Sequence, residues 1–284
     1  MAKVQILADT CCDLTEQQRD RFGIKTIPLY VSLGEKVYRD GVDVEPGMLF
    51  EYFDKTQQTP KTSAATVGDY IEFFKPYAEQ GTDIVYIGLS EKMSCTMANA
   101  RMAAEQLSGS RIFCVDSMNL STGIGLMVMR AGELAREGMG AEDIAAEMNE
   151  MAGRVRASFI LDTLEYLRRG GRCSLLASVG ASLLSLHPEI AVAGGSMSSR
   201  AKYRGKMPVA AKKYVLNLLQ GYENMDKHRV FVTYSKGCDP EIVNAAVTEV
   251  KAAGFDEVLQ SEAGSVICSH CGTNCIGFLF VDKK

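Results

Sequence analysis

Three cysteines and one histidine are packed into the eight residues from Cys268 to Cys275. Thiolate and imidazole groups are the usual ligands of structural zinc, and Cys268 and Cys271 have the Cys-x-x-Cys spacing of half such a site. The other half normally comes from a distant loop, and the adjacent pair Cys11 and Cys12 has the wrong spacing for it. We therefore predict no metal centre. We also expect no thioredoxin-like redox pair, because no helix signal follows Cys268.

A second candidate is the stretch SEKMSCT, which places Ser94 at the start of a helical pattern that runs to Leu107. The exposed amides and the dipole of a helix start favour an anion such as a carboxylate or a phosphate. Capping of the helix by Ser94 explains the serine equally well, and the sequence leaves both interpretations open. The glycine-rich loop and the lysine of a nucleotide P-loop are missing, so we do not expect ATP binding.

The stretch KTSAAT places three hydroxyl groups in a predicted loop between two helical segments. Thr66 is expected to cap the helix that runs from Val67 to Tyr77. For Thr62 and Ser63, this stretch alone favours a solvated loop over a binding role.

Two basic stretches, LRRGGR and RAKYRGK, lie in the second half of the chain. The glycines of the first let the backbone turn sharply and hold Arg172 clear of the preceding helix, which fits a solvated helix end or an anion-binding element. The second, which contains Arg204, is more often a solvated hairpin. Both stretches together, in a chain of net charge −4, indicate a local positive patch for an acidic partner or a phosphate.

The composition limits the class of protein. The chain has 284 residues, 46% hydrophobic and 23% charged, which suits two globular domains. The negative net charge gives no field that would attract nucleic acid. No apolar stretch approaches the ~20 residues that span a bilayer, and the N-terminus lacks a signal peptide, so we expect a cytoplasmic protein without stable membrane insertion. The nine cysteines are then expected to be free thiols, most of them buried.

In the first half, apolar strands alternate with helical patterns, which predicts a parallel sheet with helices on both faces. The expected strands are 3–9, 83–90 and 111–117, and the expected helices are 94–107, 123–136 and 141–155. Ligands of such sheets bind beyond the carboxyl ends of the strands, where Asp9, Ser94 and Asp116 fall.

The second half begins near Arg156 with another predicted strand. A nearly uncharged helix from Ser174 to Leu186, a hairpin turn at Gly194-Gly195 and further strands and helices predict a mixed sheet with helices. The uncharged helix suits a protein core and would also suit an apolar pocket. The fold class is therefore α/β, with an N-terminal domain over residues 1–156 and a C-terminal domain over residues 157–284.

Six short motifs, in this order, resemble the DegV family of bacterial fatty-acid-binding proteins over nearly the full chain. They are Asp9 to Leu14, Thr62-Ser63, Ser94-Cys95-Thr96, Val115-Asp116-Ser117, Leu164 to Arg172, and Ser269-His270-Cys271-Gly272. Cys95 stands where the family usually has glycine. In the last motif, His270 and Gly272 are the family positions and the cysteines are not, so the cysteines are expected to be incidental.

This resemblance implies one long-chain fatty acid bound between the two domains, with its carboxylate near Thr62 and Ser94. The fatty-acid-binding positions that it implies are Thr62, Ser63, Ser94, Thr96, His270 and Gly272. It also implies a partner, the catalytic subunit of a fatty acid kinase, which Arg172, Arg204 and His270 would face. The chain would then be a binding subunit without cofactor or metal and not an enzyme by itself.

The alternative is a small-molecule hydrolase or transferase that uses Ser94 as nucleophile and His270 as base. An α/β-hydrolase would carry a Gly-x-Ser-x-Gly elbow, whereas Met93 and Cys95 flank Ser94 here.

Overall fold

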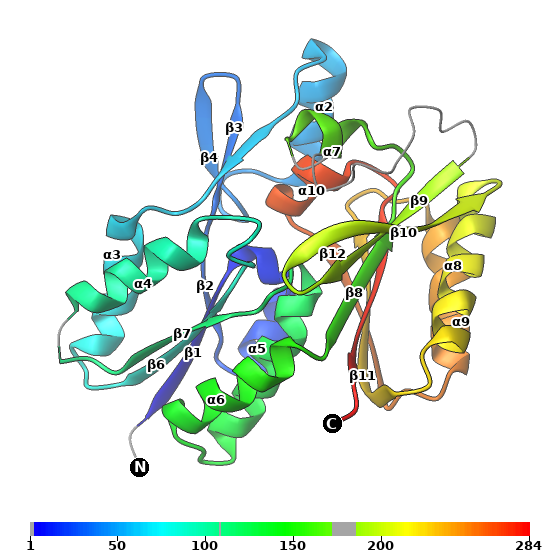
Figure 1. The fold of residues 1–284 in the computed structure, drawn as a ribbon. Helices are drawn as coiled ribbons and strands as arrows, with labels where there is room; N and C mark the ends of the chain where they lie inside the picture. Colours follow the sequence, from blue (N-terminus) through cyan, green and yellow to red (C-terminus); the bar gives the residue numbers. More distant parts are fainter. Residues whose placement is uncertain (1–2, 108, 172–185) are drawn as a thin grey trace.

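The computed structural model describes residues 3–107, 109–171 and 186–284. Within them the chain forms two α/β layers joined by a central helix (Figure 1). Arg172 and all but the last residue of the helix predicted over Ser174 to Leu186 lie outside the described residues. No helix of the described residues is long and apolar enough to cross a membrane.

The N-terminal layer is a parallel sheet in the order β2-β1-β6-β7. Its strands are β1 (Val4–Asp9), β2 (Lys25–Ile27), β6 (Asp83–Gly88) and β7 (Ile112–Asp116). One face is covered by α3 (Val67–Ala78) and α4 (Thr96–Gln106), the other by α5 (Thr122–Arg136) and α6 (Ala141–Ala152) (Figure 1). The predicted parallel sheet with helices is thus confirmed, and Thr66 caps α3 in a capping box with Asp69 as predicted.

A small antiparallel sheet in the order β4-β3-β5 extends from this layer. It contains β3 (Tyr30–Leu33), β4 (Lys36–Arg39) and β5 (Lys61–Ser63), and α2 (Pro46–Thr56) lies between β4 and β5 in the chain. The prediction of a loop at Thr62-Ser63 is therefore wrong, because Thr62 pairs with Val31 of β3. Three residues are too few to show a strand alternation, so only the partner strand makes this segment extended.

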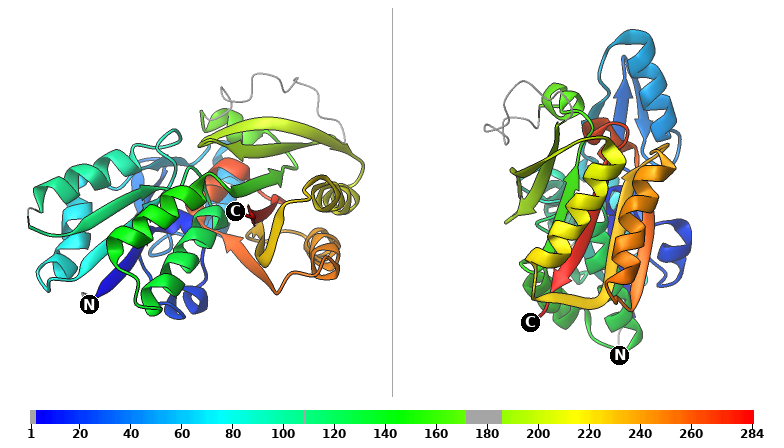
Figure 2. Two further views of the ribbon diagram at one scale, coloured as in Figure 1. Left: turned by 60° about the horizontal axis from the view of Figure 1, so that its bottom comes forward. Right: turned by 90° about the vertical axis from the view of Figure 1, so that its right-hand side faces the viewer.

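The C-terminal layer is a mixed sheet in the order β10-β9-β8-β13-β11-β12, in which only β11 and β12 pair in parallel. Its strands are β8 (Val155–Ile160), β9 (Leu186–Ala193), β10 (Ser196–Arg204), β11 (Met225–Ser235), β12 (Glu257–Ala263) and β13 (Ile276–Asp282). Two helices, α8 (Met207–Gly221) and α9 (Pro240–Ala252), lie side by side on one face (Figure 2). The mixed sheet and the Gly194-Gly195 turn are as predicted, whereas a domain boundary at residue 156 stays a prediction.

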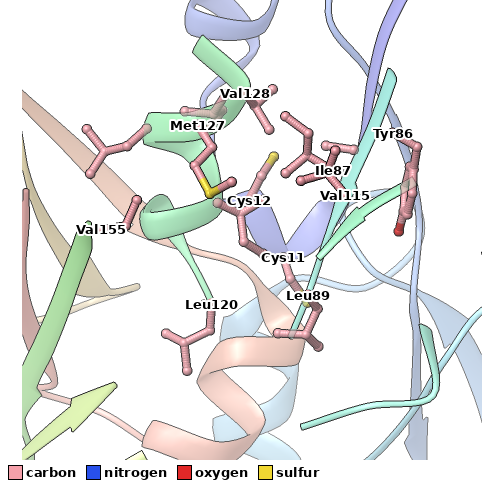
Figure 3. Packing of buried hydrophobic residues seen from close by; sticks show 14 of the residues in the cluster. Cys11, Cys12, Tyr86, Ile87, Leu89, Val115, Leu120, Met127, Val128 and Val155 are labelled. Atoms are coloured by element: carbon pink, nitrogen blue, oxygen red, sulfur yellow. The ribbon is translucent and has the colours of Figure 1, made fainter. Parts of the chain in front are cut away.

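Helix α5 lies between the two large sheets and contacts β1, β8, β11 and β13. Its side chains are buried nearly all round, as the position requires. Two glycines, Gly125 and Gly132, bring it close to its neighbours. A Cβ on Gly125 would lie 2.9 Å from the carbonyl oxygen of Cys12, and a Cβ on Gly132 would lie 2.7 Å from Cβ of Phe22. The adjoining core includes Cys11, Cys12 and Met127 (Figure 3), so these thiols are small buried apolar groups.

Two short helices, α7 (Glu165–Arg169) and α10 (Ser265–Cys271), lie against each other and beside α2 and the small sheet. Helix α10 overturns the expectation that the Cys268 segment carries no helix. It begins after Gly264 without a side-chain cap of its own. The cap comes instead from the other half of the chain, and local sequence cannot reveal it.

Two buried carboxyl groups supply this cap. Asp13 Oδ1 accepts a hydrogen bond from the Gly264 amide at 2.8 Å, and Asp40 Oδ1 accepts one from the Ser265 amide at 2.8 Å. Asp13 Oδ2 also accepts a hydrogen bond from Ser121 Oγ at 2.5 Å. Burial raises the pKa of Asp13 to about 8 and also raises the pKa of Asp40.

The pKa of Asp13 predicts a fold that weakens as the pH rises. Between the unfolded value near 3.8 and the folded value of about 8, the folded state binds more protons, so the free energy of unfolding falls with rising pH. Burial raises the pKa of Asp9 to about 6, so above pH 6 this group adds little to the dependence of the free energy of unfolding on pH. Asp13→Asn, which cannot titrate, should remove up to ~1.4 kcal/mol per pH unit of this slope between about pH 6.5 and 8.

Urea unfolding of the two proteins across this range measures the slope. Asp143→Asn, on the exposed first turn of α6, is the matched control and should keep the wild-type slope. Identical slopes for wild type and Asp13→Asn would contradict the assignment.

Candidate binding pocket

A cavity of about 110 Å³ lies between the two layers, and both halves of the chain line it. The pocket-facing side of the C-terminal sheet forms its floor, through Phe159 of β8, Thr233 of β11, and Gly277 and Leu279 of β13. The N-terminal half contributes apolar groups opposite, among them Leu29, Leu89 and Leu120. Helix α10 adds Val266, Ile267 and His270. Most of the lining side chains are therefore apolar.

Thr62 and His270 meet in this pocket although 208 residues separate them. Thr62 Oγ1 lies 2.9 Å from His270 Nε2, and both side chains are half-buried. Pairing of β5 with β3 positions Thr62, and packing of α10 on these two strands positions His270. The sequence proposed both residues, and the structure brings them together.

Ser94 reaches the pocket from a tight turn before α4. The Ser90 carbonyl oxygen accepts hydrogen bonds from the Met93 and Ser94 amides at 2.9 and 3.1 Å, which fixes this turn. Ser94 Oγ lies 2.7 Å from Thr96 Oγ1 and accepts the Thr96 amide at 3.3 Å. The sequence left open whether Ser94 caps the helix or binds a ligand. The N-cap residue of α4 is Cys95, but Ser94 Oγ accepts the amide of the first helical residue and also lines the pocket.

The remaining predicted residues fall at different distances from the pocket. Ser63 lines it, and Thr96 lies buried behind Ser94 without being a lining residue. Arg204 is exposed at the end of β10, outside the lining. Arg172 lies outside the described residues.

Gly272 has a packing role at the end of α10. Its φ is +72°, and an added Cβ would lie 2.5 Å from the ring of Tyr166. It does not line the pocket. Gly170 has a related role, because a Cβ there would lie 2.5 Å from His270 Nδ1. Gly170, the first glycine of LRRGGR, therefore leaves space for the imidazole of His270. Helix termination alone does not explain a glycine at this position.

Sequence reasoning missed Ser121, which lines the pocket at the N-cap position of α5. Its φ of +53° and ψ of −145° fall in a region that residues other than glycine rarely adopt, at a cost of about 1–3 kcal/mol. The hydrogen bond to the buried Asp13 holds this conformation. No local sequence signal marks it.

Two of the clustered cysteines, Cys271 and Cys275, do line the pocket. A hydrogen bond with Cys271, together with burial, raises the pKa of the Cys268 thiol well above its ordinary value. A neutral thiol is neither a good metal ligand nor a good nucleophile. Among the residues described, no group of three or more His, Cys, Asp or Glu side chains could hold a metal ion. The two lining thiols act as small apolar surface.

The hydrolase alternative requires Ser94 and His270 to act on each other. Instead, Ser94 Oγ is engaged with Thr96, and His270 Nε2 is engaged with Thr62. This arrangement does not favour a nucleophile and its base.

Comparison with known proteins links this geometry to one family. A sequence model described as "Uncharacterised protein, DegV family" matches residues 3–283. A DegV domain-containing protein of Clostridium acetobutylicum is 30% identical over the full length of both chains.

Solved structures agree with the sequence comparison. A DegV family protein from Thermus thermophilus, described for its fatty acid binding, is 30% identical with a TM-score of 0.89, over 99% of this chain and 100% of that one. A DegV lipid-binding protein from Thermotoga maritima is 25% identical with a TM-score of 0.86, over 99% and 100% of the two chains.

The packing role of Gly272 predicts a loss of stability that needs no ligand. Gly272→Ala should lower the free energy of unfolding by about 1–3 kcal/mol more than Gly171→Ala, because only the former meets a ring. The two glycines share a φ of +72°, and a Cβ on Gly171 would meet nothing within 4 Å. Urea unfolding of the two purified variants gives both values. Equal losses of unfolding free energy in the two variants would show that a Cβ at position 272 is not destabilised by contact with the Tyr166 ring.

Proposed function

This chain belongs to the DegV family, and we propose that it binds one long-chain fatty acid in the pocket between its two layers. In this proposal, Thr62 and Ser94 hold the carboxylate and the alkyl chain lies over the C-terminal sheet. The observation that carries the proposal is a mainly apolar cavity that is also lined by the Thr62–His270 pair and by Ser94, whose hydroxyl is paired with the buried Thr96. The fatty acid binding described for the Thermus thermophilus relative supports it.

The tail and the head group of a fatty acid contribute differently to the free energy of binding. Burial of each methylene is worth ~0.8 kcal/mol, so a palmitoyl chain contributes roughly 11 kcal/mol before the costs of ordering. One hydrogen bond to a charged group adds about 1.5–3 kcal/mol. In this proposal the apolar floor supplies most of the affinity, and the hydroxyl groups determine the orientation of the bound lipid.

Each head-group hydroxyl has a second group behind it that can donate to it. When His270 Nε2 carries a hydrogen, it donates to Thr62 Oγ1 and leaves the Thr62 hydroxyl free to donate to a carboxylate. Thr96 can do the same for Ser94. Such chains polarise one another and strengthen the last bond. In this proposal Thr96 acts through Ser94 and His270 through Thr62, while Ser63 lies at the rim and Gly272 shapes the end of α10.

The polar end of the pocket can hold an anion through hydrogen bonds alone, without contact to a lysine or arginine side chain. None of the described residues that line the pocket is a lysine or an arginine. Hydroxyl donors and an imidazole can hold a carboxylate and still release it to a reaction more readily than a bidentate arginine would.

We further infer that the bound carboxylate is presented to the catalytic subunit of a fatty acid kinase, which would convert it to an acyl phosphate. The chain carries no nucleotide motif, so the phosphoryl donor must come with the partner. Support comes from β10, an edge strand on which Arg200, Lys202 and Arg204 are exposed at alternate positions. Such a row suits an acidic surface of a partner. Arg172, which lies outside the described residues, is proposed for the same contact on the basis of its sequence motif alone, and a cytoplasmic location follows from the proposed reaction.

Loss of the Ser94 hydroxyl should weaken the head-group contact alone. Ser94→Ala is expected to raise the dissociation constant for palmitate by about 5- to 150-fold, equivalent to about 1–3 kcal/mol. Thr96→Val should weaken binding by a smaller factor, and Thr96→Ser should restore it. Native mass spectrometry with lipid extraction, followed by titration of stripped protein, measures these effects. Ser198→Ala, exposed on β10, is the control. Wild-type protein that binds no fatty acid would refute the proposed function.

Arg204 should separate lipid binding from lipid transfer, because it lies outside the pocket. Arg204→Ala is expected to keep wild-type fatty acid occupancy but to lower acyl-phosphate formation with a cognate kinase and ATP by about 5- to 30-fold, equivalent to about 1–2 kcal/mol. Lys251→Ala, on the exposed side of α9, is the matched control. Unchanged transfer would remove Arg204 from the partner surface. His270 cannot serve this test, because its contact with Thr62 also supports the head-group site.

A further inference from the structure

Gly277 lies in the interior of β13, a central strand of the C-terminal sheet. Its neighbours Ile276 and Phe278 are fully buried. Glycine weakens a strand interior and commonly marks a bulge, a bend, or a place where a ligand or another backbone approaches closely. The register with β8 runs without a shift from Ile276 to Val281, which excludes a bulge on that side. Gly277 is also not among the residues with positive φ.

The register places Gly277 in a row across the pocket floor. It pairs with Phe159 of β8 on one side and with Thr233 of β11 on the other. All three line the pocket, and the three strands lie side by side in Figure 1. The row therefore has no side chain at its middle position, between Phe159 and Thr233, and this position is called the gap below.

The pocket also follows β13 lengthwise. Cys275, Gly277 and Leu279 are alternate residues of this segment, and each lines the pocket. At about 3.4 Å per residue, Cys275 to Leu279 spans roughly 13–14 Å, from the end of α10 towards the C-terminus. Gly277 is the midpoint of this path. A ligand that lies along β13 from Cys275 to Leu279 passes over it.

We propose that Gly277 sets the length of acyl chain that the pocket accepts, by letting the alkyl chain lie against the backbone of β13 between Phe159 and Thr233. This inference rests on the proposed function and adds a specificity-determining residue to it. Methylenes beyond the gap reach Leu279 only while position 277 has no side chain.

The surroundings of Gly277 show which substitutions are informative. An added Cβ would lie 3.2 Å from the Ser158 carbonyl oxygen, 3.3 Å from Leu279 Cδ1 and 3.4 Å from Phe159 Cβ. Alanine therefore requires shifts of a few tenths of an ångström. Valine adds two further methyl groups at a position that lines the pocket. Gly277→Ala thus reports local crowding, and Gly277→Val reports obstruction of the path.

The experiment measures the affinities of lipid-stripped wild type, Gly277→Ala and Gly277→Val for decanoate, myristate, palmitate and stearate. Obstruction of two or more methylenes removes about 1.6 kcal/mol or more, so Gly277→Val should bind palmitate and stearate more than about tenfold more weakly. Its affinity for decanoate should change by less than about threefold. Equal losses for all four acids, or unchanged affinities, would overturn the proposal.

A second variant keeps the test decisive if Gly277→Val does not fold. Phe159→Ala widens the gap from the other side, so it should shift the preference from palmitate towards stearate, and unchanged relative affinities would overturn the proposal. In the double variant, Phe159→Ala should restore palmitate binding to Gly277→Val. Wild-type protein that binds none of the four acids would refute the proposed function itself. Wild-type binding with unaltered chain-length preference in the variants refutes only the role of Gly277.

Discussion

The contact between two buried carboxyl groups and the first turn of α10 is the constraint on which the pocket depends. Asp13 and Asp40 come from the N-terminal half and accept the amides of Gly264 and Ser265 from the C-terminal half. Desolvation of the carboxyl groups opposes this contact, since burial raises both pKa values. The amides and the start of the helix dipole compensate. Because α10 carries His270, the same contact sets the imidazole against Thr62 on the opposite half.

The apolar packing around α5 makes this polar contact possible. A helix buried nearly all round between two sheets fixes the distance between the layers, and its N-cap residue, Ser121, donates to Asp13. The unusual backbone conformation of Ser121 is thus held by the same carboxyl group that caps α10. One buried side chain thereby connects the wall of the pocket, the helix that carries the histidine and the core between the sheets. A cavity assembled in this way is largely preformed, which would limit the entropy lost on binding of the proposed lipid.

Much of the fold could be predicted from local sequence, because long apolar strands and capped helices carry their own signals. The parallel strands of the first half, the Gly194-Gly195 turn and the Thr66 cap are examples. The failures share a physical cause. β5 is too short to show a period and is extended only through β3, and α10 is capped by carboxyl groups more than two hundred residues away. Motif order suggested Thr62 and His270 as site residues, but only the fold shows that they touch.

The cysteines that dominate the segment around His270 show why residue type alone misleads. Their spacing resembles half of a metal site, yet a hydrogen bond with Cys271, together with burial, raises the pKa of the Cys268 thiol, and Cys271 and Cys275 line a mainly apolar cavity. In that setting a thiol is a small polarizable group that fits against an alkyl chain. The same segment places the polar end of the pocket and part of its apolar floor within ten residues, from His270 to Leu279. In the proposed complex, helix α10 would orient the head group, and β13, the next element of the chain, would receive the tail, so the direction of the lipid would follow the order of the chain.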